Sequence, residues 1–224
     1  MEEKRQLKSG FTTGTCAAAA AMAAAQALAG GGKREYVSLM TPGGREAAFE
    51  VLWQPECGEK AGGGQDGFWP GSESPEKQIC MVRKDSGDDP DVTNGTLIGA
   101  AVSFGENVQR AELPGIYSDH SQSPSVYLTG GIGVGRVTKK GLKCPVGYPA
   151  INPVPRQMIA EAARTALWNL GCERPVYIEI FIPSGRELAL KTFNPRLGIA
   201  GGISVLGTTG IVNPMSEQAL IETI

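Results

Sequence analysis

Residues 10–32 read GFTTGTCAAAAAMAAAQALAGGG, the most regular stretch of the chain. Alanine is the best helix former, so we expect a helix from about Thr15 to Ala29. Thr12, Thr13 or Thr15 would cap its first turn, and the three glycines that follow would end it. Small side chains all around this helix would let other backbone pack very close to it.

The alanine run also imitates a secretory signal, because basic residues precede it and Ala27-Leu28-Ala29 is similar to a cleavage site. Glu2, Glu3 and the polar threonines occupy the places where an apolar region should begin, which argues against a signal peptide. No stretch of about 20 strongly apolar residues could span a membrane. The five cysteines are odd in number and form no C-x-x-C pair. We therefore expect a cytoplasmic protein with free thiols.

Composition narrows the class of protein further. The chain has 224 residues, 41% of them hydrophobic, and a formal charge of −2. This suits a globular protein of one large or two small domains, and it argues against a nucleic-acid binder with a strongly basic surface. The single histidine, His120, lies in a polar stretch typical of an exposed loop, so a histidine-based triad or zinc site is disfavoured.

The remaining elements mix helices and strands without a clean βαβ repeat, so we predict an α+β fold. A hairpin is expected around the turn at 41–44, a second one around 183–185, and a helix from Pro155 to Asn169. Residues 56–77, rich in Gly, Ser and charge, are expected to form a flexible loop. Further expected elements are strands at 79–82 and 126–129, a helix from Asp91 or Thr93 toward Phe104, and a helix that begins at Ser216.

The first candidate site is the threonine-rich segment that opens the alanine helix. Bare backbone N–H groups and the positive end of the helix dipole would favour an anion there, and the same field would favour the Cys16 thiolate. The alternative is a capping segment followed by a small buried cysteine. The residues alone do not separate the two.

The second candidate is an acidic loop that contains Asp85, Asp88, Asp89 and Asp91. Its spacing is not that of an EF-hand, and clustered aspartates often make turns or a solvated face. A carboxylate of this loop could instead accept a proton or hold a ribose or an amine. The four aspartates could also ligate a hard cation, although we do not expect a metal site here.

The third candidate is the glycine run 130–135. Its spacing is not that of the dinucleotide fingerprint, and no helix follows it. What it offers is backbone open to close approach by a ligand, followed at once by cations that suit several carboxylates or phosphates. The alternative is a solvated basic edge strand. The cations are Arg136, Lys139, Lys140 and Lys143, with Arg156 on the helix that follows.

Taken together and in order, five segments resemble the cobalt-precorrin-5B (C1)-methyltransferase family (CbiD) of anaerobic cobalamin biosynthesis. The segments are Gly10–Ala17, Arg83–Thr93, Gly130–Gly133, Pro149–Arg156 and Asn194–Ile199. The resemblance implies an enzyme that moves a methyl group from S-adenosylmethionine to C1 of cobalt-precorrin-5B, with cobalt only inside the substrate. It also implies no nucleic-acid or membrane partner, and it leaves a homo-oligomer open.

The resemblance implies a domain plan and a set of site residues. Residues 1–193 would be an α+β substrate-binding domain similar to a circularly permuted ribosomal-protein S5 second domain, and 194–224 would begin a second α/β domain. Asp85, Asp88 and Asp89 would serve catalysis by moving a proton or holding the donor. One shallow cationic seat would hold the substrate through Thr12, Thr13, Gly14, Thr15, Gly131, Gly133, Arg136, Lys139, Lys140, Asn152, Arg156 and Arg196.

Two departures from the family pattern are Asn94, where we expect His, and Tyr148, where we expect Glu. If either family residue moves a proton, this chain lacks it. Two other functions stay open on the sequence. One is a nucleotide- or phosphate-binding transferase that uses the Thr12–Cys16 segment as a cradle, and the other is a substrate-binding fragment without catalysis.

Overall fold

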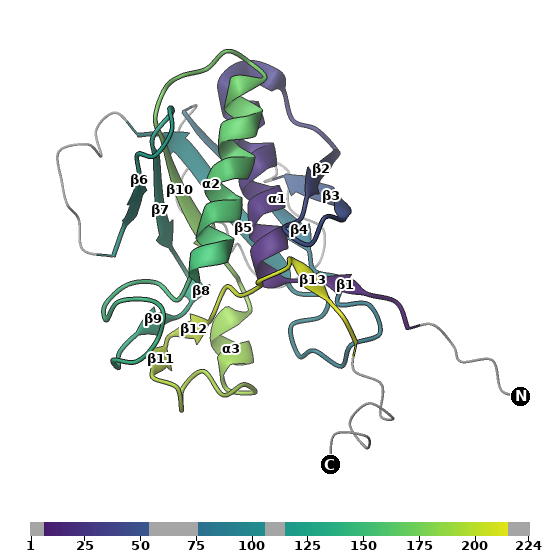
Figure 1. Ribbon diagram of the computed structural model, residues 1–224, viewed down its shortest axis with the longest axis vertical. Coiled ribbons are helices and arrows are strands. Elements are labelled where there is room, and N and C mark those ends of the chain that lie inside the picture. Colours follow the sequence, from purple (N-terminus) through teal and green to yellow (C-terminus); the bar gives the residue numbers. More distant parts are fainter. Residues whose placement is uncertain (1–6, 54–75, 106–114, 215–224) are drawn as a thin grey trace, which may run out of the picture.

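The computed structural model describes residues 7–53, 76–105 and 115–214. Two long helices, α1 (Thr13–Gln26) and α2 (Pro153–Trp168), lie side by side against one face of a seven-stranded sheet (Figure 1). A π-helical turn, η1 (Ala27–Gly31), ends α1. The helix expected at the alanine run is confirmed, and Thr12 is its N-cap. The predicted α+β class is also confirmed.

The sheet has the strand order β2-β3-β4-β5-β10-β7-β6. All neighbouring strands are antiparallel except β10 and β7, a parallel pair between which the chain passes through α2. The strands are β2 (Tyr36–Met40), β3 (Glu46–Trp53), β4 (Lys77–Arg83), β5 (Leu97–Phe104), β6 (Tyr117–Asp119), β7 (Val126–Gly130) and β10 (Val176–Phe181).

The alanine side chains place α1 between α2 and the middle of the sheet. Every residue of α1 except Met22 and Gln26 is buried, and the helix contacts β4, β5 and α2. The approach is close enough for the Cys80 thiol of β4 to donate a hydrogen bond to the Ala20 carbonyl of α1 at 3.2 Å. Burying alanine costs no side-chain entropy, so the helix gains packing without losing rotamer freedom.

Three short two-stranded ladders, one isolated bridge and a small helix gather at the N-terminal end of α1 and α2 (Figure 1). They bring the end of the described chain back onto its beginning and onto the glycine run. The elements are β1 (Gly10–Phe11) with β13 (Ile211–Val212), β8 (Gly133–Val134) with β12 (Gly202–Ile203), β9 (Arg136–Val137) with β11 (Ile199–Ala200), the bridge from Ile151 to Val205, and α3 (Gly185–Ala189). Strands from residues 199–212 therefore pair with segments before residue 138. The domain boundary at Asn194 and the likeness to ribosomal protein S5 stay predictions.

Two expected elements are wrong. Leu97–Phe104 is a strand and not the end of a helix, because both faces of β5 are buried and the chain needs no polar alternation there. Residues 187–191 do not pair with β10 in a hairpin, since β5 and β7 already occupy both edges of β10 and residues 185–189 form α3 instead.

The other expected elements are found close to their predicted bounds. The hairpin of β2 and β3, the strands β4 and β7, and the helix α2 are confirmed, and His120 is exposed. Most of the loop predicted at 56–77, and the helix predicted from Ser216, lie outside the described residues. No helix in the described ranges is long and apolar enough to cross a membrane.

Candidate functional site

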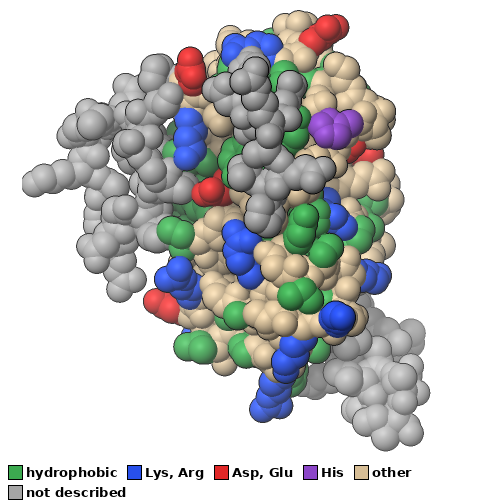
Figure 2. Space-filling model, turned by 90° about the vertical axis from the view of Figure 1, so that its left-hand side faces the viewer, with side chains coloured by type: hydrophobic (Ala, Val, Ile, Leu, Met, Phe, Trp, Pro, Cys, Tyr) green, Lys and Arg blue, Asp and Glu red, His purple; other side chains and the backbone are tan. Residues whose placement is uncertain are grey.

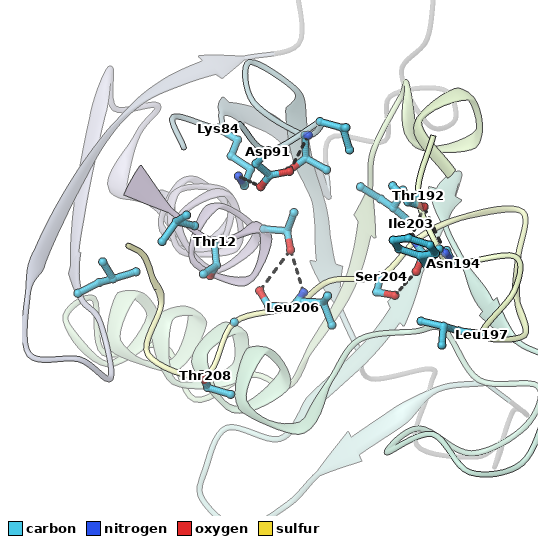
Figure 3. A pocket seen from close by; sticks show the side chains of 17 residues that line it. Thr12, Lys84, Asp91, Thr192, Asn194, Leu197, Ile203, Ser204, Leu206 and Thr208 are labelled. Atoms are coloured by element: carbon cyan, nitrogen blue, oxygen red, sulfur yellow. Dashed lines mark hydrogen bonds and ion pairs between the residues drawn. The ribbon is translucent and has the colours of Figure 1, made fainter. Parts of the chain in front are cut away.

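Two recesses flank the segment 199–206 at the N-terminal end of α1. The threonine cavity, about 450 Å³, is lined by Thr12 and Thr13, by Lys84 and Asp91, and by residues of 192–212 (Figure 3). The glycine hollow, about 550 Å³, is lined by residues 130–134 and by Arg136, Glu179, Arg186, Ala200 and Gly201. Both volumes fit one small ligand, and neither could enclose a whole tetrapyrrole macrocycle.

The first turn of α1 is already bonded by the protein itself. The Gly14 N–H donates to the Leu206 carbonyl at 2.8 Å, and the Thr15 N–H donates to the Thr12 hydroxyl at 3.2 Å. The Thr15 hydroxyl, fully buried, donates to the Gly210 carbonyl at 2.6 Å. The expected bare donors at Gly14 and Thr15 are therefore wrong, and the alternative of a capping segment is confirmed. Thr12 and Thr13 still line the cavity.

Cys16 follows the same pattern. Its side chain is fully buried, and burial raises the pKa of its thiol to about 12 although the Lys84 charge opposes the shift. A thiolate at the start of α1 is therefore not favoured, and the expectation of a reactive cysteine is wrong. Cys16 is a small core residue.

A buried ion pair forms one wall of the threonine cavity. The Lys84 side chain is 1% exposed, and its ammonium lies 2.7 Å from an Asp91 carboxylate oxygen and donates to the Ser86 hydroxyl. Burial disfavours the charge of Asp91, but Lys84 and the backbone N–H and hydroxyl of Thr93 outweigh it and hold the Asp91 pKa below its usual value. The Asp91 carboxylate is thus held by Lys84 and Thr93 in its charged form at neutral pH.

The other aspartates of the acidic loop lie outside both recesses. The Lys8 ammonium lies 2.6 Å from Asp85, and the Lys8 backbone N–H donates to Asp88 at 2.7 Å. The hydrogen bond from Lys8, aided by the Gly87 N–H, lowers the Asp85 pKa. Asp89 is half-buried and lines neither recess. Within the described ranges no three His, Cys, Asp or Glu side chains could hold a metal ion.

The opposite wall of the threonine cavity comes from the segment 192–206. The Ser204 hydroxyl donates to the Asn194 side-chain oxygen at 2.7 Å, and the Asn194 amide donates to the Thr192 hydroxyl at 2.9 Å. Large apolar side chains stand exposed around the opening, with exposed fractions from 48% to 71%. This apolar rim consists of Val92, Phe193, Leu197 and Leu206. The cavity therefore offers satisfied polar walls and an apolar entrance.

The expected single cationic seat is not found. Of the five predicted cations only Arg136 lines the glycine hollow with Gly131 and Gly133, and its guanidinium also donates to the Gly147 carbonyl at 3.1 Å. Arg156 stacks 4.0 Å over the Tyr117 ring, and Arg196 lies 5.8 Å over the ring of Phe193 on the apolar rim.

The remaining predicted contacts also line neither recess. Lys139 packs against Gly198, Lys140 is exposed, and Asn152 is the N-cap residue of α2. Figure 2 shows Lys and Arg side chains gathered over the lower half of one face, at the end of the molecule that holds β9 and β11. The cations are therefore spread over this surface and do not line one common cleft.

Sequence reasoning singled out Asp91 in the acidic loop but missed three charged residues of the two recesses, Lys84, Glu179 and Arg186. Lys84 lies in a segment that the family motif contains, but it is held beside the sheet by the hydrogen bond from its backbone N–H to the Thr96 carbonyl, a contact that carries no local signal. Glu179 breaks the apolar run of β10, which was the one available hint. Arg186 follows a turn that the sequence assigned to a hairpin.

The chain shares its fold and its sequence with a known protein family. A crystal structure described as cobalamin biosynthesis protein (cbiD) from Archaeoglobus fulgidus matches 97% of this chain and 58% of that one, with a TM-score of 0.63 and 32% identity. The CbiD family profile matches residues 1–214, and the chain belongs to the CbiD family.

Curated relatives carry a more specific name. Proteins of Geobacillus kaustophilus and Bradyrhizobium sp., 45% and 46% identical over 98% of this chain, are both named cobalt-precorrin-5B C(1)-methyltransferase. Each match covers 50% of the relative. The chain thus spans about half the length of these curated relatives.

Proposed function

We propose that this chain takes part in the methylation of C1 of cobalt-precorrin-5B, with S-adenosylmethionine as the methyl donor. The observation that carries the proposal is the 45% identity, over 98% of the chain, to relatives named for this reaction. In the transfer, a ring carbon of the corrinoid forms a bond to the methyl carbon as the bond to the sulfonium sulfur breaks, and the sulfur leaves as a neutral thioether. Cobalt enters only as part of the substrate.

The threonine cavity and its rim are the proposed seat of the corrinoid. Because the cavity of about 450 Å³ is too small for the macrocycle, the ring would lie across the apolar rim and insert one edge. Phe193 and Leu197 offer apolar surface to that ring, and Asp91 rather than Asp85, Asp88 or Asp89 faces the cavity. Holding the ring rigidly serves the reaction, since methyl transfer depends mainly on the alignment of three atoms.

The distributed cations are proposed to hold the carboxylate arms of the corrinoid. Arg196 is on the rim itself through its contact with Phe193, and Lys139 packs on Gly198 of the same turn. A surface ion pair contributes little alone, so affinity would come from several arms held together. Arg136, Lys140 and Arg156 complete the set.

The test is a titration of the chain with cobalt-precorrin-5B followed by its absorbance spectrum, together with transfer of labelled methyl from S-adenosylmethionine. Phe193→Ala and Arg196→Gln should each weaken corrinoid binding about fivefold or more. Arg34→Gln, an exposed arginine that lines neither recess, is the matched control and should leave binding unchanged. Binding that is equal in all three variants would reject the seat.

Corrinoid binding without methyl transfer is the second candidate function, favoured by the apolar rim and the surrounding cations, which would suit the ring and its carboxylates alone. Tight binding in the titration and no transferred label would support it. A phosphate cradle is disfavoured, because Leu206 and Thr12 already accept hydrogen bonds from the first turn of α1. A thermal-shift comparison of ATP with S-adenosylhomocysteine separates a phosphate cradle from a methyl-donor site, since only a ligand that binds the folded state raises Tm.

A further inference from the structure

Two charged side chains of opposite sign line the glycine hollow without a partner in the described part of the chain. Glu179 is half-buried and Arg186 is exposed, and neither makes a hydrogen bond or an ion pair there. Neither belongs to the cationic set proposed to hold the corrinoid. By contrast, Lys84 and Lys8 each form an ion pair with an aspartate.

Strand alternation directs Glu179 into the hollow. Val176, Ile178 and Ile180 of β10 are buried in the core that contains both helices, so Glu179 faces the other side of the sheet. Its neighbours in register are Ala101 and Thr129, which carry no charge. The sheet does not require a carboxylate at this position, because an apolar or hydroxyl side chain would pair as well with Ala101 and Thr129.

The glycine turn supports the Glu179 carboxylate from one side. A Cβ on Gly131 would lie only 2.5 Å from Glu179 Oε1, so the carboxylate rests directly on the Gly131 backbone. Charges of Glu179 and Arg136 both act on the Tyr177 hydroxyl, whose pKa is raised by burial and by Glu179 and lowered by Arg136. Glu179 therefore shares one side of the sheet with Arg136.

The same turn sets the position of Arg186. Gly185 packs on the backbone of Gly133, so that the chain enters α3 directly beside the turn. Gly131 and Gly133 are two residues apart, which is at most about 7 Å along the chain. A long arginine side chain from residue 186 covers that span, and both side chains line the same hollow of about 550 Å³.

We propose that the glycine hollow binds an α-amino-acid headgroup, with Glu179 holding the ammonium and Arg186 the carboxylate. The ligand class is a zwitterion attached to a larger group, and within the proposed function it is the methionine part of the methyl donor. This inference rests on the proposed function for the identity of the donor. Arg136 lines the same hollow, so a carboxylate arm of the corrinoid would lie beside the donor headgroup.

A polycarboxylate alone fits the hollow less well. Glu179 would repel each additional carboxylate, whereas a zwitterion matches both signs. The side chains that Gly131 and Gly133 lack would fill space taken by Glu179 and by the Ile182 carbonyl, so these glycines let the walls of the hollow pack closely. The charge pattern, and not the glycine spacing, thus defines the ligand.

The experiment is calorimetric titration of the chain with S-adenosylhomocysteine and with 5′-methylthioadenosine, which has the same nucleoside and sulfur without the amino acid. The unmodified chain should bind S-adenosylhomocysteine at least tenfold more tightly. Glu179→Gln and Arg186→Gln should each weaken its binding about tenfold, because each removes a charge-assisted hydrogen bond, and leave 5′-methylthioadenosine binding unchanged. Glu187→Gln, an exposed neighbour on α3, is the control and should behave as wild type.

Three results would overturn the headgroup site. The first is equal affinity of the unmodified chain for both nucleosides, and the second is no binding of S-adenosylhomocysteine. The third is unchanged binding of S-adenosylhomocysteine in Arg186→Gln, which is exposed and should fold normally. Corrinoid binding in the separate titration would still support the substrate seat, so the two proposals fail independently. Circular-dichroism melting curves check that Glu179→Gln is folded.

Discussion

Replacing Lys84 by Met tests the role assigned to the buried ion pair. Met has a similar length and leaves little cavity, so the main effect is an Asp91 carboxylate without its cation. Breaking a buried pair on one side costs about 3–5 kcal/mol. The Asp91 side chain is 25% exposed and keeps its hydrogen bonds from Thr93, so we expect the lower end, about 3 kcal/mol.

The assay is urea unfolding followed by circular dichroism. With a slope of about 3 kcal/mol/M, the unfolding midpoint should fall by about 1 M. Lys8→Met, which removes an exposed pair with Asp85, is the matched control and should leave the midpoint nearly unchanged. Asp91→Asn should lower the free energy of unfolding less in the Lys84→Met background than in the wild-type chain, because the two residues are coupled. A midpoint for Lys84→Met within about 0.2 M of wild type would refute the reasoning.

Three further predictions address positions outside this pair. Arg164→Met removes hydrogen bonds to the Pro124 and Asp119 carbonyls and to the Asp119 carboxylate, and should cost about 3 kcal/mol in urea unfolding at pH 7. Burial opposes the charge of Asp119, but Arg164 and Ser121 lower its pKa to about 2. The stabilisation by this carboxylate is therefore full above pH 4 and is lost toward pH 2, so the difference in unfolding free energy between wild type and Arg164→Met should narrow over that range. A difference that stays constant with pH would contradict the pairing. The methyl group of Gly133→Ala would overlap the Ile182 carbonyl oxygen, so this variant should destabilise the fold far more than Gly201→Ala. Gly201 has a similar positive φ but faces open space, so its replacement should cost about 1–2 kcal/mol of folding free energy. Equal melting temperatures of the two variants would contradict this difference. Iodoacetamide at pH 8 should label half-buried Cys172 well before Cys16 and Cys80, because burial raises the pKa values of those two thiols. Mass spectrometry of peptides from protein labelled in the native state measures the order of labelling, and early labelling of Cys16 would contradict the prediction.

The sequence predicted the elements whose signal is local. An alanine run between threonines and glycines could form only a helix, and the turn at 41–44 between two alternating segments could form only a hairpin. Leu97–Phe104 was predicted wrongly because a strand buried on both faces shows no alternation. The segment after β10 was predicted wrongly because its exclusion from the sheet depends on β7, which lies about fifty residues earlier in the chain.

The site was predicted less well than the fold, for a related reason. Charge and hydroxyl content drew attention to Thr15 and Asp85, which the structure uses for a buried bond to Gly210 and for an exposed pair with Lys8. Local sequence shows which groups could bind a ligand, but only tertiary pairing shows which ones the protein has already bonded. Lys84 illustrates the converse, since it is buried beside the sheet, where its backbone N–H donates to the Thr96 carbonyl, although its local sequence would leave it in water.

For the same reason, the two recesses differ in the kind of ligand that each can bind selectively. In the threonine cavity the Lys84–Asp91 pair, the Ser204–Asn194 bond and the first turn of α1 satisfy one another, so a ligand there gains mainly from the apolar rim. In the glycine hollow, Glu179 and Arg186 have no partner among the described residues, so a ligand there gains from charge. A broad ring needs surface and a small zwitterion needs placed charges. The proposed division of acceptor and donor between the two recesses follows from that difference, and it predicts that rim variants alter corrinoid affinity while hollow variants alter donor affinity.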